Sequence, residues 1–492
     1  MAKNLDLLLV NPGNRISQFG NVSEYATVAQ PLGIAMLANF LREKGYSIDL
    51  FDAEVHNLGP REAVDEILKY NPRAVGLTAF TTKMTAAGKI MSILKEVSPD
   101  IITLVGGHHV SAVPRKTLEE ESVDFVIQGE GYVPLLRLIK ILKEGKNPRG
   151  FKIPGLHYHS EGFKKGSIIS NPPEELIRKL EKLPSPAWDL LPMEKYKAHH
   201  WQTWGRGNQN SFGLVFSSLG CPFSCEFCSV NVVYGKRGSR FLTPEQFVEQ
   251  IDNLVENYGT EHIEIIDDTF TLNTKRVIKI SELIADRGYN INMWCFARTD
   301  RTDPEMLSKM KKAGINWVFM GLESGSDKTL LKNSKKQNQN QIRSAVKKIK
   351  DAGIYLGGNF IFGLPGDTHE SMQETLDLAL ELNSEWANFF IPMAYPGTKI
   401  YEDALGKGIL PRYWEQYGFF APNAVPLPTS KLNSEEIITF RDKAFDTFFG
   451  SSNYQNMIEE KFGSEIKKYI TQMLTKKLDR TPNPERELKY LL

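Results

Sequence analysis

The segment "SSLGCPFSCEFCSVNVVYGKRG", residues 217–238, holds three of the four cysteines of this 492-residue chain within eight residues. Cys221, Cys225 and Cys228 follow the spacing C-x-x-x-C-x-x-C, and a tight loop with that spacing can direct three thiolates to one centre. A structural zinc site normally has four protein ligands, whereas an iron–sulfur cluster held by three thiolates leaves one iron free to bind another molecule. The spacing therefore favours such a cluster, and a zinc site completed by Cys295 or a histidine is the alternative.

Alternating strand and helix patterns surround this segment. Helical patterns such as residues 244–259 and 340–353 separate apolar runs that are typical of strands. The predicted strands cover residues 212–218, 262–268, 291–297, 316–324, 354–363 and 386–393. Six βα units predict a partial, TIM-like barrel whose chemistry lies at the carboxyl ends of the strands. The cysteine segment follows the first strand directly, so we expect it in a loop at that end.

The N-terminal part of the chain shows the same alternation and predicts a doubly wound parallel sheet. Strands are expected at residues 5–11, 46–53, 74–80, 101–107 and 124–130, and helices at 31–45, 60–71, 85–99, 114–121 and 132–145. In this architecture ligands bind outside the carboxyl ends of the strands. Those ends carry "NPGN", "TAFTT", "VGGHH" and "QGEG", small and polar residues that let a large ligand approach the backbone. Ordinary surface turns are the alternative for each.

A proline-rich stretch between the two series predicts a domain boundary. The fold class is therefore α/β. We expect a Rossmann-like domain at residues 1–147, a connector with a small hairpin at 148–206, the partial barrel at 207–400 and a helical C-terminal region at 401–492.

Composition excludes several classes of protein. Sixty basic and fifty-nine acidic residues give a net charge of +1, which argues against nucleic acid or an anionic membrane as an obligate partner. No run approaches the roughly eighteen apolar residues that a transmembrane helix needs, and the N-terminal apolar run is too short for a signal peptide. We therefore expect a cytoplasmic protein, in which clustered cysteines bind metal or act in catalysis.

The string "CPFSCEFC" resembles the signature of the radical S-adenosylmethionine (SAM) enzymes, including the aromatic Phe227 before the third cysteine. The strings "IIDDTFTLN" (265–273), "GLESGS" (321–326) and "GNFIFGLPGDT" (358–368) resemble family segments that hold SAM, and they end the second, fourth and fifth predicted strands. The N-terminal strings "AQPLGIAMLANFLREKGYSIDLFDAE", "VGLTAFTT", "VGGHHVSAVP" and "VIQGEGY" resemble the cobalamin-binding domain fused ahead of many such barrels.

This resemblance implies a [4Fe–4S] cluster held by Cys221, Cys225 and Cys228, whose fourth iron binds the amino and carboxylate groups of SAM. An electron from a reductant such as flavodoxin or ferredoxin would cleave SAM to methionine and a 5′-deoxyadenosyl radical, which removes hydrogen from a substrate. The protein positions and shields the cofactors that carry this chemistry.

The resemblance also implies a set of SAM contacts. They are Phe227, Asp268, Thr269, Arg298, Glu323, Ser324, Ile361 and Gly363. Asp268 and Thr269 match positions at the methionine amino group, although the family's usual glycine pair and glutamate is absent here. The adenine is expected to lie against the backbone at Ile361 and Gly363.

Glu323, Arg298, Tyr395 and Cys295 each have two competing interpretations. Glu323 and Ser324 match positions near the ribose and carboxylate of SAM, with a helix-capping carboxylate as the alternative for Glu323. Arg298 can pair with the SAM carboxylate through its planar fork, or form a surface salt bridge. Tyr395 is expected to face the substrate, with a core position as the alternative. Cys295 is expected to pack as a small buried apolar residue.

The cobalamin is expected to lie against the loops that end the N-terminal strands. The residues implied are Thr78, Thr81, Thr82, Gly106, Gly107, His108, His109, Gly129 and Glu130. The string "EVHNLG" (54–59) has the form E-x-H-x-x-G, but it follows the second strand, whereas the related D-x-H-x-x-G motif belongs after the first. We therefore interpret His56 as a loop residue and expect no histidine ligand to cobalt.

Together the two cofactor modules favour a methyltransferase that acts on an unactivated carbon of a small-molecule or lipid-like substrate. A radical SAM cyclase or rearrangement enzyme is the second hypothesis, and a non-catalytic corrinoid or iron–sulfur protein is the third. A methylthiotransferase is disfavoured because the N-terminal half has no cysteine to hold an auxiliary cluster.

Overall fold

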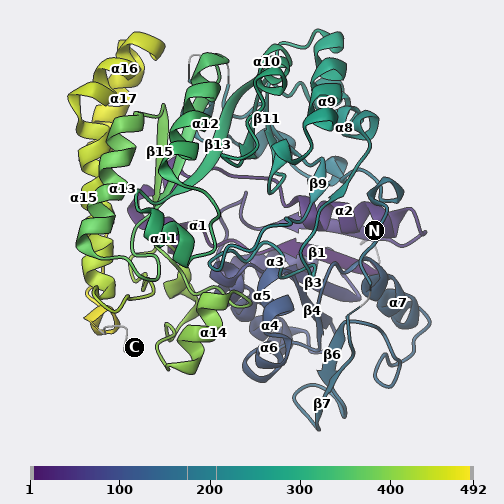
Figure 1. Cartoon of the computed structure of the whole chain (residues 1–492). Coiled ribbons are helices and arrows are strands. Elements are labelled where there is room, and N and C mark those ends of the chain that lie inside the picture. Colours follow the sequence, from purple (N-terminus) through teal and green to yellow (C-terminus); the bar gives the residue numbers. More distant parts are fainter. Residues whose placement is uncertain (1–4, 174, 205, 207, 488–492) are drawn as a thin grey trace.

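The computed structural model describes residues 5–173, 175–204, 206 and 208–487. Its two main sheets lie in different halves of Figure 1, the N-terminal sheet below and the second sheet above. The α/β fold class predicted from the sequence is confirmed.

The N-terminal sheet has the strand order β2-β1-β3-β4-β5-β6-β7. Its parallel strands are β1 (Leu7–Asn11), β2 (Ile48–Asp52), β3 (Ala74–Thr78), β4 (Ile102–Gly106) and β5 (Phe125–Ile127). The helices between and after them are α2 (Leu32–Arg42), α3 (Pro60–Lys69), α4 (Met84–Val97), α5 (His108–Ala112), α6 (Pro114–Glu120) and α7 (Tyr132–Lys143). The expected doubly wound alternation is present, and two short helices of this unit, α1 (Arg15–Phe19) and α5, were not predicted from the pattern.

Both faces of this sheet are buried, which explains why its strands read as continuous apolar runs. Along β1, Leu7 and Leu9 join one hydrophobic core, whereas Leu8 and Val10 join another on the opposite face. Successive side chains of a strand point to opposite faces, so an unbroken apolar strand needs helices on both sides. The carboxyl edge of the sheet remains the place where polar loops gather.

The predicted hairpin exists and extends the first sheet. β6 (Leu156–His159) and β7 (Ile168–Ser170) pair antiparallel with each other, and β6 pairs antiparallel with β5. The hairpin lies within the segment 148–206 predicted as a connector, so the first sheet continues past residue 147. The division into domains itself stays a prediction.

The second sheet is entirely parallel and has the order β15-β14-β13-β12-β11-β8. Its strands are β8 (Phe212–Val215), β11 (His262–Ile265), β12 (Asn292–Ala297), β13 (Ile315–Glu323), β14 (Tyr355–Ile361) and β15 (Trp386–Phe390). The intervening helices are α8 (Pro244–Tyr258), α9 (Thr274–Arg287), α10 (Pro304–Lys312), α11 (Asp327–Lys332), α12 (Gln339–Asp351) and α13 (His369–Leu382). In the described part of the chain β8 and β15 are the two edge strands and do not pair with each other, so the sheet does not close into a full barrel. The predicted partial barrel is confirmed.

The connector closes this barrel near the amino ends of its strands. Trp201 lies between three strands, with its ring centroid 4.6 Å from Phe319, 5.3 Å from Trp317 and 5.7 Å from Trp386. Register pairing sets Trp317 beside Trp294, whose ring centroid is 6.4 Å from that of Trp201. This aromatic cluster fills the interior at the amino end of the barrel, opposite the end at which the cysteine segment leaves β8.

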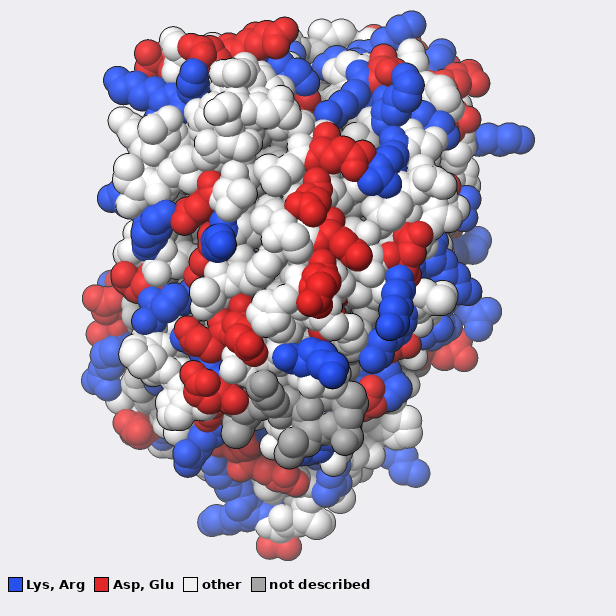
Figure 2. Space-filling view, turned by 60° about the vertical axis from the view of Figure 1, so that its left-hand side comes forward, with Lys and Arg blue, Asp and Glu red and all other residues white. Residues whose placement is uncertain are grey.

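The C-terminal helices form a layer beside β15, drawn in green and yellow at the left of Figure 1. They are α15 (Ser434–Gly450), α16 (Ser452–Phe462) and α17 (Ser464–Thr475), whereas the short helix α14 (Lys399–Gly406) lies apart from them, near the bottom of the view. Figure 2 turns this side toward the viewer, and basic and acidic side chains are interspersed over it. None of the described helices combines the length and the apolar character that crossing a bilayer requires.

Replacing Trp201 by alanine should destabilise the fold, because it empties a space enclosed by four aromatic rings. We expect a loss of about 3–5 kcal/mol in the free energy of unfolding, measured by urea denaturation. The control is Tyr413→Ala at a 51% exposed residue, which should change stability by no more than about 0.5 kcal/mol. Equal effects of the two substitutions would contradict this role of Trp201.

Candidate functional site

The three cysteines lie in a loop closed by a short antiparallel ladder. β9 (Ser218–Leu219) pairs with β10 (Arg240–Phe241), so the chain leaves and returns at the carboxyl end of β8. Gly220 has φ +87°, and a Cβ there would lie 2.5 Å from the Gly238 carbonyl oxygen. Within the loop, the Asn231 side chain accepts a hydrogen bond from the Cys221 N–H (3.1 Å) and donates one to the Cys221 carbonyl (2.8 Å). Cys221 is therefore fixed by backbone contacts on both sides.

Two carboxylates at the end of β11 hold the start of this loop. Asp267 accepts hydrogen bonds from the Ser217 N–H (2.6 Å) and from the hydroxyls of Ser217 (2.5 Å) and Ser218 (2.6 Å). Asp268 accepts one from the Gly220 N–H at 3.1 Å. Burial, and secondly the charge of Asp267, raise the pKa of Asp268 to about 7. The Asp268 carboxyl is therefore about half protonated near pH 7, and a cationic group beside it would favour its ionised form.

All three thiols open into one large cavity of about 810 Å³ between the two sheets. Its wall also contains Ser111, Ala112 and Gln128 from the N-terminal unit, and Gly397 and Thr398 from beyond β15. The carboxyl edges of both sheets therefore face the same space.

In the absence of a metal, the surroundings of Cys221 and Cys228 favour the protonated thiols over the thiolates. Cys228 is exposed to the cavity, but the many protein atoms around it raise the pKa of its thiol to about 12. Burial also raises the pKa of Cys221, which the nearby Asp268 and Cys225 raise further. A bound metal reverses such shifts, because coordination deprotonates a thiol outright.

The arrangement of the thiols fits a cluster better than a single ion. In the described residues no three His, Cys, Asp or Glu side chains converge on a point where one ion could bind. Cluster cysteines each bind a different iron, so they need not converge in this way. The zinc alternative gains no support from Cys295, which is fully buried in the core, as expected, and does not line the cavity.

Two of the residues predicted to contact SAM pack against the cysteine loop. The Arg298 guanidinium lies 3.6 Å above the Phe223 ring, and its Nε is 3.1 Å from Asp300 Oδ1. Arg298 is only 7% exposed, but it forms a salt bridge with the exposed Asp300, as its alternative interpretation expected, and its pairing with SAM stays a prediction. The buried Thr269 side chain is within hydrogen-bonding reach of the Cys221 thiol. Phe227 is half-buried against the cluster that contains Ala394 and Ile400.

Glu323 occupies a strained position at the end of β13. Its φ is +65°, and its carboxylate pairs with Lys335 at 2.7 Å, both side chains being almost inaccessible. The helix-capping alternative is wrong, because α11 begins after Ser326 and Glu323 pairs with a lysine instead. A Cβ at Gly321 would lie 2.3 Å from Glu323 Oε1, so this pair needs a glycine beside it. Burial and a non-glycine positive φ often accompany functional positions.

The remaining predicted SAM residues have structural partners. The Ser324 hydroxyl is 3.2 Å from that of Thr375 on α13 and accepts a hydrogen bond from the Ser326 N–H. Gly363 has φ +90°, and its N–H donates to Asp367 at 3.0 Å. Ile361 is buried at the end of β14. Their contacts with SAM stay predictions.

The residues predicted to line the cobalamin site lie in the loops after β3, β4 and β5. Thr81, Thr82 and His108 line a cavity of about 200 Å³ together with Ser229 and Tyr395 from the second unit. The Thr78, Gly106 and Gly107 backbones lie at the adjoining strand ends, and a Cβ at Gly107 would be 2.9 Å from the Ala79 carbonyl oxygen. Tyr395 also lines this cavity and donates a hydrogen bond to the Tyr417 carbonyl (2.9 Å), and its contact with the substrate stays a prediction.

The two adjacent histidines are held apart by different aromatic partners. His108 stacks on the exposed Phe80 at 4.9 Å, whereas His109 Nδ1 is 3.3 Å from the Thr81 hydroxyl and its ring meets Trp414 edge-on at 4.5 Å. Burial lowers the pKa of His108 to about 4, and burial with the charge of Lys116 lowers that of His109 to about 3. Both are therefore neutral near pH 7. His56 is an exposed loop residue stacked on Phe51, as interpreted.

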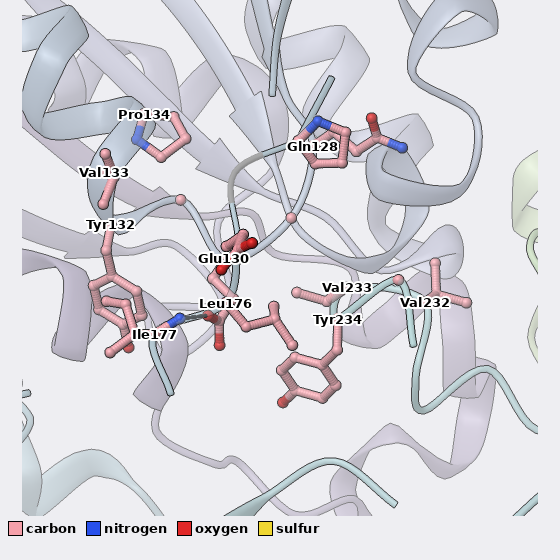
Figure 3. Close-up of a pocket in the computed structure, with 15 residues that line it drawn as sticks. Gln128, Glu130, Tyr132, Val133, Pro134, Leu176, Ile177, Val232, Val233 and Tyr234 are labelled. Carbon is pink, nitrogen blue, oxygen red and sulfur yellow. Dashed lines mark hydrogen bonds between the residues drawn. The ribbon is translucent and has the colours of Figure 1, made fainter. Parts of the chain in front are cut away.

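Glu130 lies at a junction of the first unit, the connector and the cysteine loop, shown in Figure 3. Its carboxylate binds both guanidinium nitrogens of Arg240 (2.5 and 3.1 Å) and accepts a hydrogen bond from the Ile177 N–H (3.2 Å). Glu130 thus links the two units rather than pointing a free carboxylate at a ligand. Sequence reasoning missed Arg240, because a partner 110 residues away leaves no local pattern.

Comparison with known proteins supports both halves of this site. The family model "Radical SAM superfamily" matches residues 215–379, and "B12 binding domain" matches residues 20–139. An uncharacterized methyltransferase of Pyrococcus horikoshii is 34% identical over 425 residues, covering 86% of this chain and 88% of that protein. The anaerobic magnesium-protoporphyrin IX monomethyl ester cyclase of Rubrivivax gelatinosus is 28% identical over 401 residues, covering 80% of this chain and 70% of the cyclase.

A solved structure shares the fold. The radical SAM methyltransferase TsrM from Kitasatospora setae, with cobalamin and a [4Fe–4S] cluster bound, superposes with a TM-score of 0.63 at 18% identity, covering 83% of this chain and 75% of that one.

Removing any one of the three loop cysteines should abolish cluster assembly. We expect Cys221→Ala, Cys225→Ala and Cys228→Ala, purified without oxygen and reconstituted, to lose most of their iron, sulfide and visible absorbance. The matched control is Cys295→Ala, which removes a thiol from the core and should keep its iron. If all four variants held equal iron, these thiols would not be the ligands.

Asp268→Asn should stabilise the cofactor-free chain in a pH-dependent way. The raised pKa means that the folded state prefers the protonated carboxyl, so the wild-type chain loses stability as pH rises from about 4 to 7. Asparagine keeps an acceptor for the Gly220 N–H and removes the charge. We expect a gain of about 1–3 kcal/mol at pH 8 and a smaller one at pH 5, from urea denaturation.

The control for this comparison is Asp286→Asn, at an exposed residue of α9. It should change stability little at either pH. If Asp268→Asn lost the same amount of stability at both pH values, the ionised form of Asp268 would not be destabilised in the folded chain.

Proposed function

Because the chain belongs to the radical SAM superfamily and carries a B12-binding domain, we propose that it transfers a methyl group to an unactivated carbon atom of its substrate. It is a cobalamin-dependent radical SAM enzyme whose cofactors are a [4Fe–4S] cluster, SAM and cobalamin.

One observation carries the proposal: the two cofactor units share a single cavity. The 810 Å³ space is bounded by Cys221, Cys225 and Cys228 on one side and by Ser111 and Gln128 on the other. Methylation of an unactivated carbon requires hydrogen removal and methyl delivery at the same atom, so both cofactors must reach one substrate position. The relative of 34% identity is also named a methyltransferase.

When bound, the cluster and SAM supply a radical that removes hydrogen, and cobalamin supplies the methyl group. The chain's own residues hold these groups in place. The three cysteines would bind the cluster, while Arg298, rigid on Phe223, would pair with the SAM carboxylate. Asp268 would accept a hydrogen bond from the N–H of the SAM amino group, and such a bond favours the ionised form of this buried carboxyl.

The loops of the N-terminal unit would cradle cobalamin without a histidine ligand to cobalt. The His109 Nδ1 lies within hydrogen-bonding distance of the Thr81 hydroxyl, and its ring packs edge-on against Trp414. The His108 ring stacks on Phe80. The electron donor would be a flavodoxin or ferredoxin, as the superfamily's chemistry requires a reductant.

Ring formation is the second candidate. The 28% identity to the magnesium-protoporphyrin ester cyclase, over 80% of this chain, favours it. The two reactions differ in whether the methyl group of SAM reaches the product.

Trideuteriomethyl-SAM distinguishes the two. The reconstituted enzyme with cobalamin and reductant is incubated with a small-molecule and lipid extract, and products are examined by mass spectrometry. Methyl transfer predicts a product carrying the intact deuterated methyl group, absent with Cys225→Ala. Formation of 5′-deoxyadenosine together with a new product that carries no label would overturn the proposal in favour of ring formation.

A further inference from the structure

A second large cavity, of about 420 Å³, lies along the free edge of β15. It is bounded by β15, α15, α17 and residues 19–27 near the N-terminus. It shares no lining residue with the cysteine cavity. Its volume is within the range typical of small-molecule sites.

The walls of this cavity are mainly aromatic. The aromatic lining residues are Phe19, Tyr25, His199, Trp201, Trp386, Phe389, Phe420 and Phe445. Val22, Ala26, Ala387, Met473 and Leu478 add aliphatic surface. Such a surface favours an apolar ligand body, because transfer of apolar area out of water stabilises binding.

One charged side chain is buried in this apolar wall. Arg441 is 3% exposed, donates from Nε to the Phe389 carbonyl (2.8 Å) and from Nη1 to Asp442 (2.7 Å), and its guanidinium lies 4.8 Å above Phe420. Within the described residues its Nη2 group makes no hydrogen bond. A guanidinium presents five donors in a fixed fork, so Arg441 keeps donors for an acceptor inside the cavity.

The charges around Arg441 leave an excess of positive charge. Asp442 is shared, because Arg480 also binds it through Nε and Nη2, each at 3.0 Å. At the rim Lys477 pairs with Asp446 (2.6 Å), while Lys476 is exposed and has no ion pair within the described part of the chain. The two carboxylates of Asp442 and Asp446 therefore stand against four cationic groups, which are Arg441, Arg480, Lys476 and Lys477.

From this combination we propose that the cavity binds an amphiphilic anion, with an apolar chain or ring against the aromatic wall and one carboxylate or phosphate at Arg441 and Lys476. The site needs neither the cluster nor cobalamin, so it is independent of the proposed methyl transfer. The segment that continues from β15 reaches Gly397 and Thr398 in the cysteine cavity, which connects the two spaces through one stretch of chain.

The test is a titration of the cofactor-free chain with dodecanoate, dodecyl phosphate, dodecanol and dodecyltrimethylammonium below their micelle concentrations. Binding is read from tryptophan fluorescence, since Trp201 and Trp386 line the cavity. At least one anion should bind saturably and about tenfold more tightly than the alcohol, as expected for a hydrogen bond to a charged group. The anion that binds more tightly identifies the head group as carboxylate or phosphate.

Two variants locate the binding. Arg441→Met keeps the length and apolar contact of the side chain and should weaken anion binding about tenfold. Because Arg441 also binds the Phe389 carbonyl, a second variant avoids the core: Lys476→Glu should weaken it about threefold or more. Lys468→Glu, the same charge change at an exposed residue of α17 outside the cavity, should have no effect.

Equal affinity for the anions and dodecanol, no saturable binding of either anion, or equal effects of Lys476→Glu and Lys468→Glu would each overturn the proposal.

Discussion

The buried carboxylate of Asp267 is the contact on which the site depends most. It satisfies the Ser217 N–H and the hydroxyls of Ser217 and Ser218 at the point where β8 turns into the cysteine loop. A buried carboxylate is costly unless its acceptors are used, so this position strongly favours a single path for the chain. Asp268 and Gly220 extend the same arrangement by one residue. The direction in which the loop leaves the sheet, and hence the cavity that its thiols face, follows from these contacts.

The second requirement is that the N-terminal sheet present its carboxyl edge to that loop. Glu130 and Arg240 link the two units directly, and Ser229 and Tyr395 meet Thr81 and His108 in a small cavity. Both cofactor units then open toward common space, while the Trp201 cluster fills the opposite end of the barrel. The fold therefore places the proposed chemistry in the cavity that the three cysteines line.

Much of this fold was predictable because its strands are local apolar runs separated by amphipathic helices. β1 and β13 illustrate this, since neither needs a distant partner to be identified. The site was predictable where its residues sit in short motifs, as Cys221, Cys225 and Cys228 do. The partner of Glu323 could not be read from the sequence, because the lysine that neutralises it follows a helix and a turn. Trp201 was missed for a related reason: a proline-rich connector has no periodicity that reveals a side chain inserted into a barrel.

The proposed chemistry requires that the three thiolates hold a cluster and leave one iron for SAM. The most direct measurement is electron–nuclear double resonance on the reduced, reconstituted enzyme with SAM labelled with ¹⁵N at its amino group. We expect a hyperfine coupling between the cluster spin and that nitrogen, which disappears when SAM is omitted. Bound SAM with no such coupling, on an enzyme with its full iron content, would contradict it.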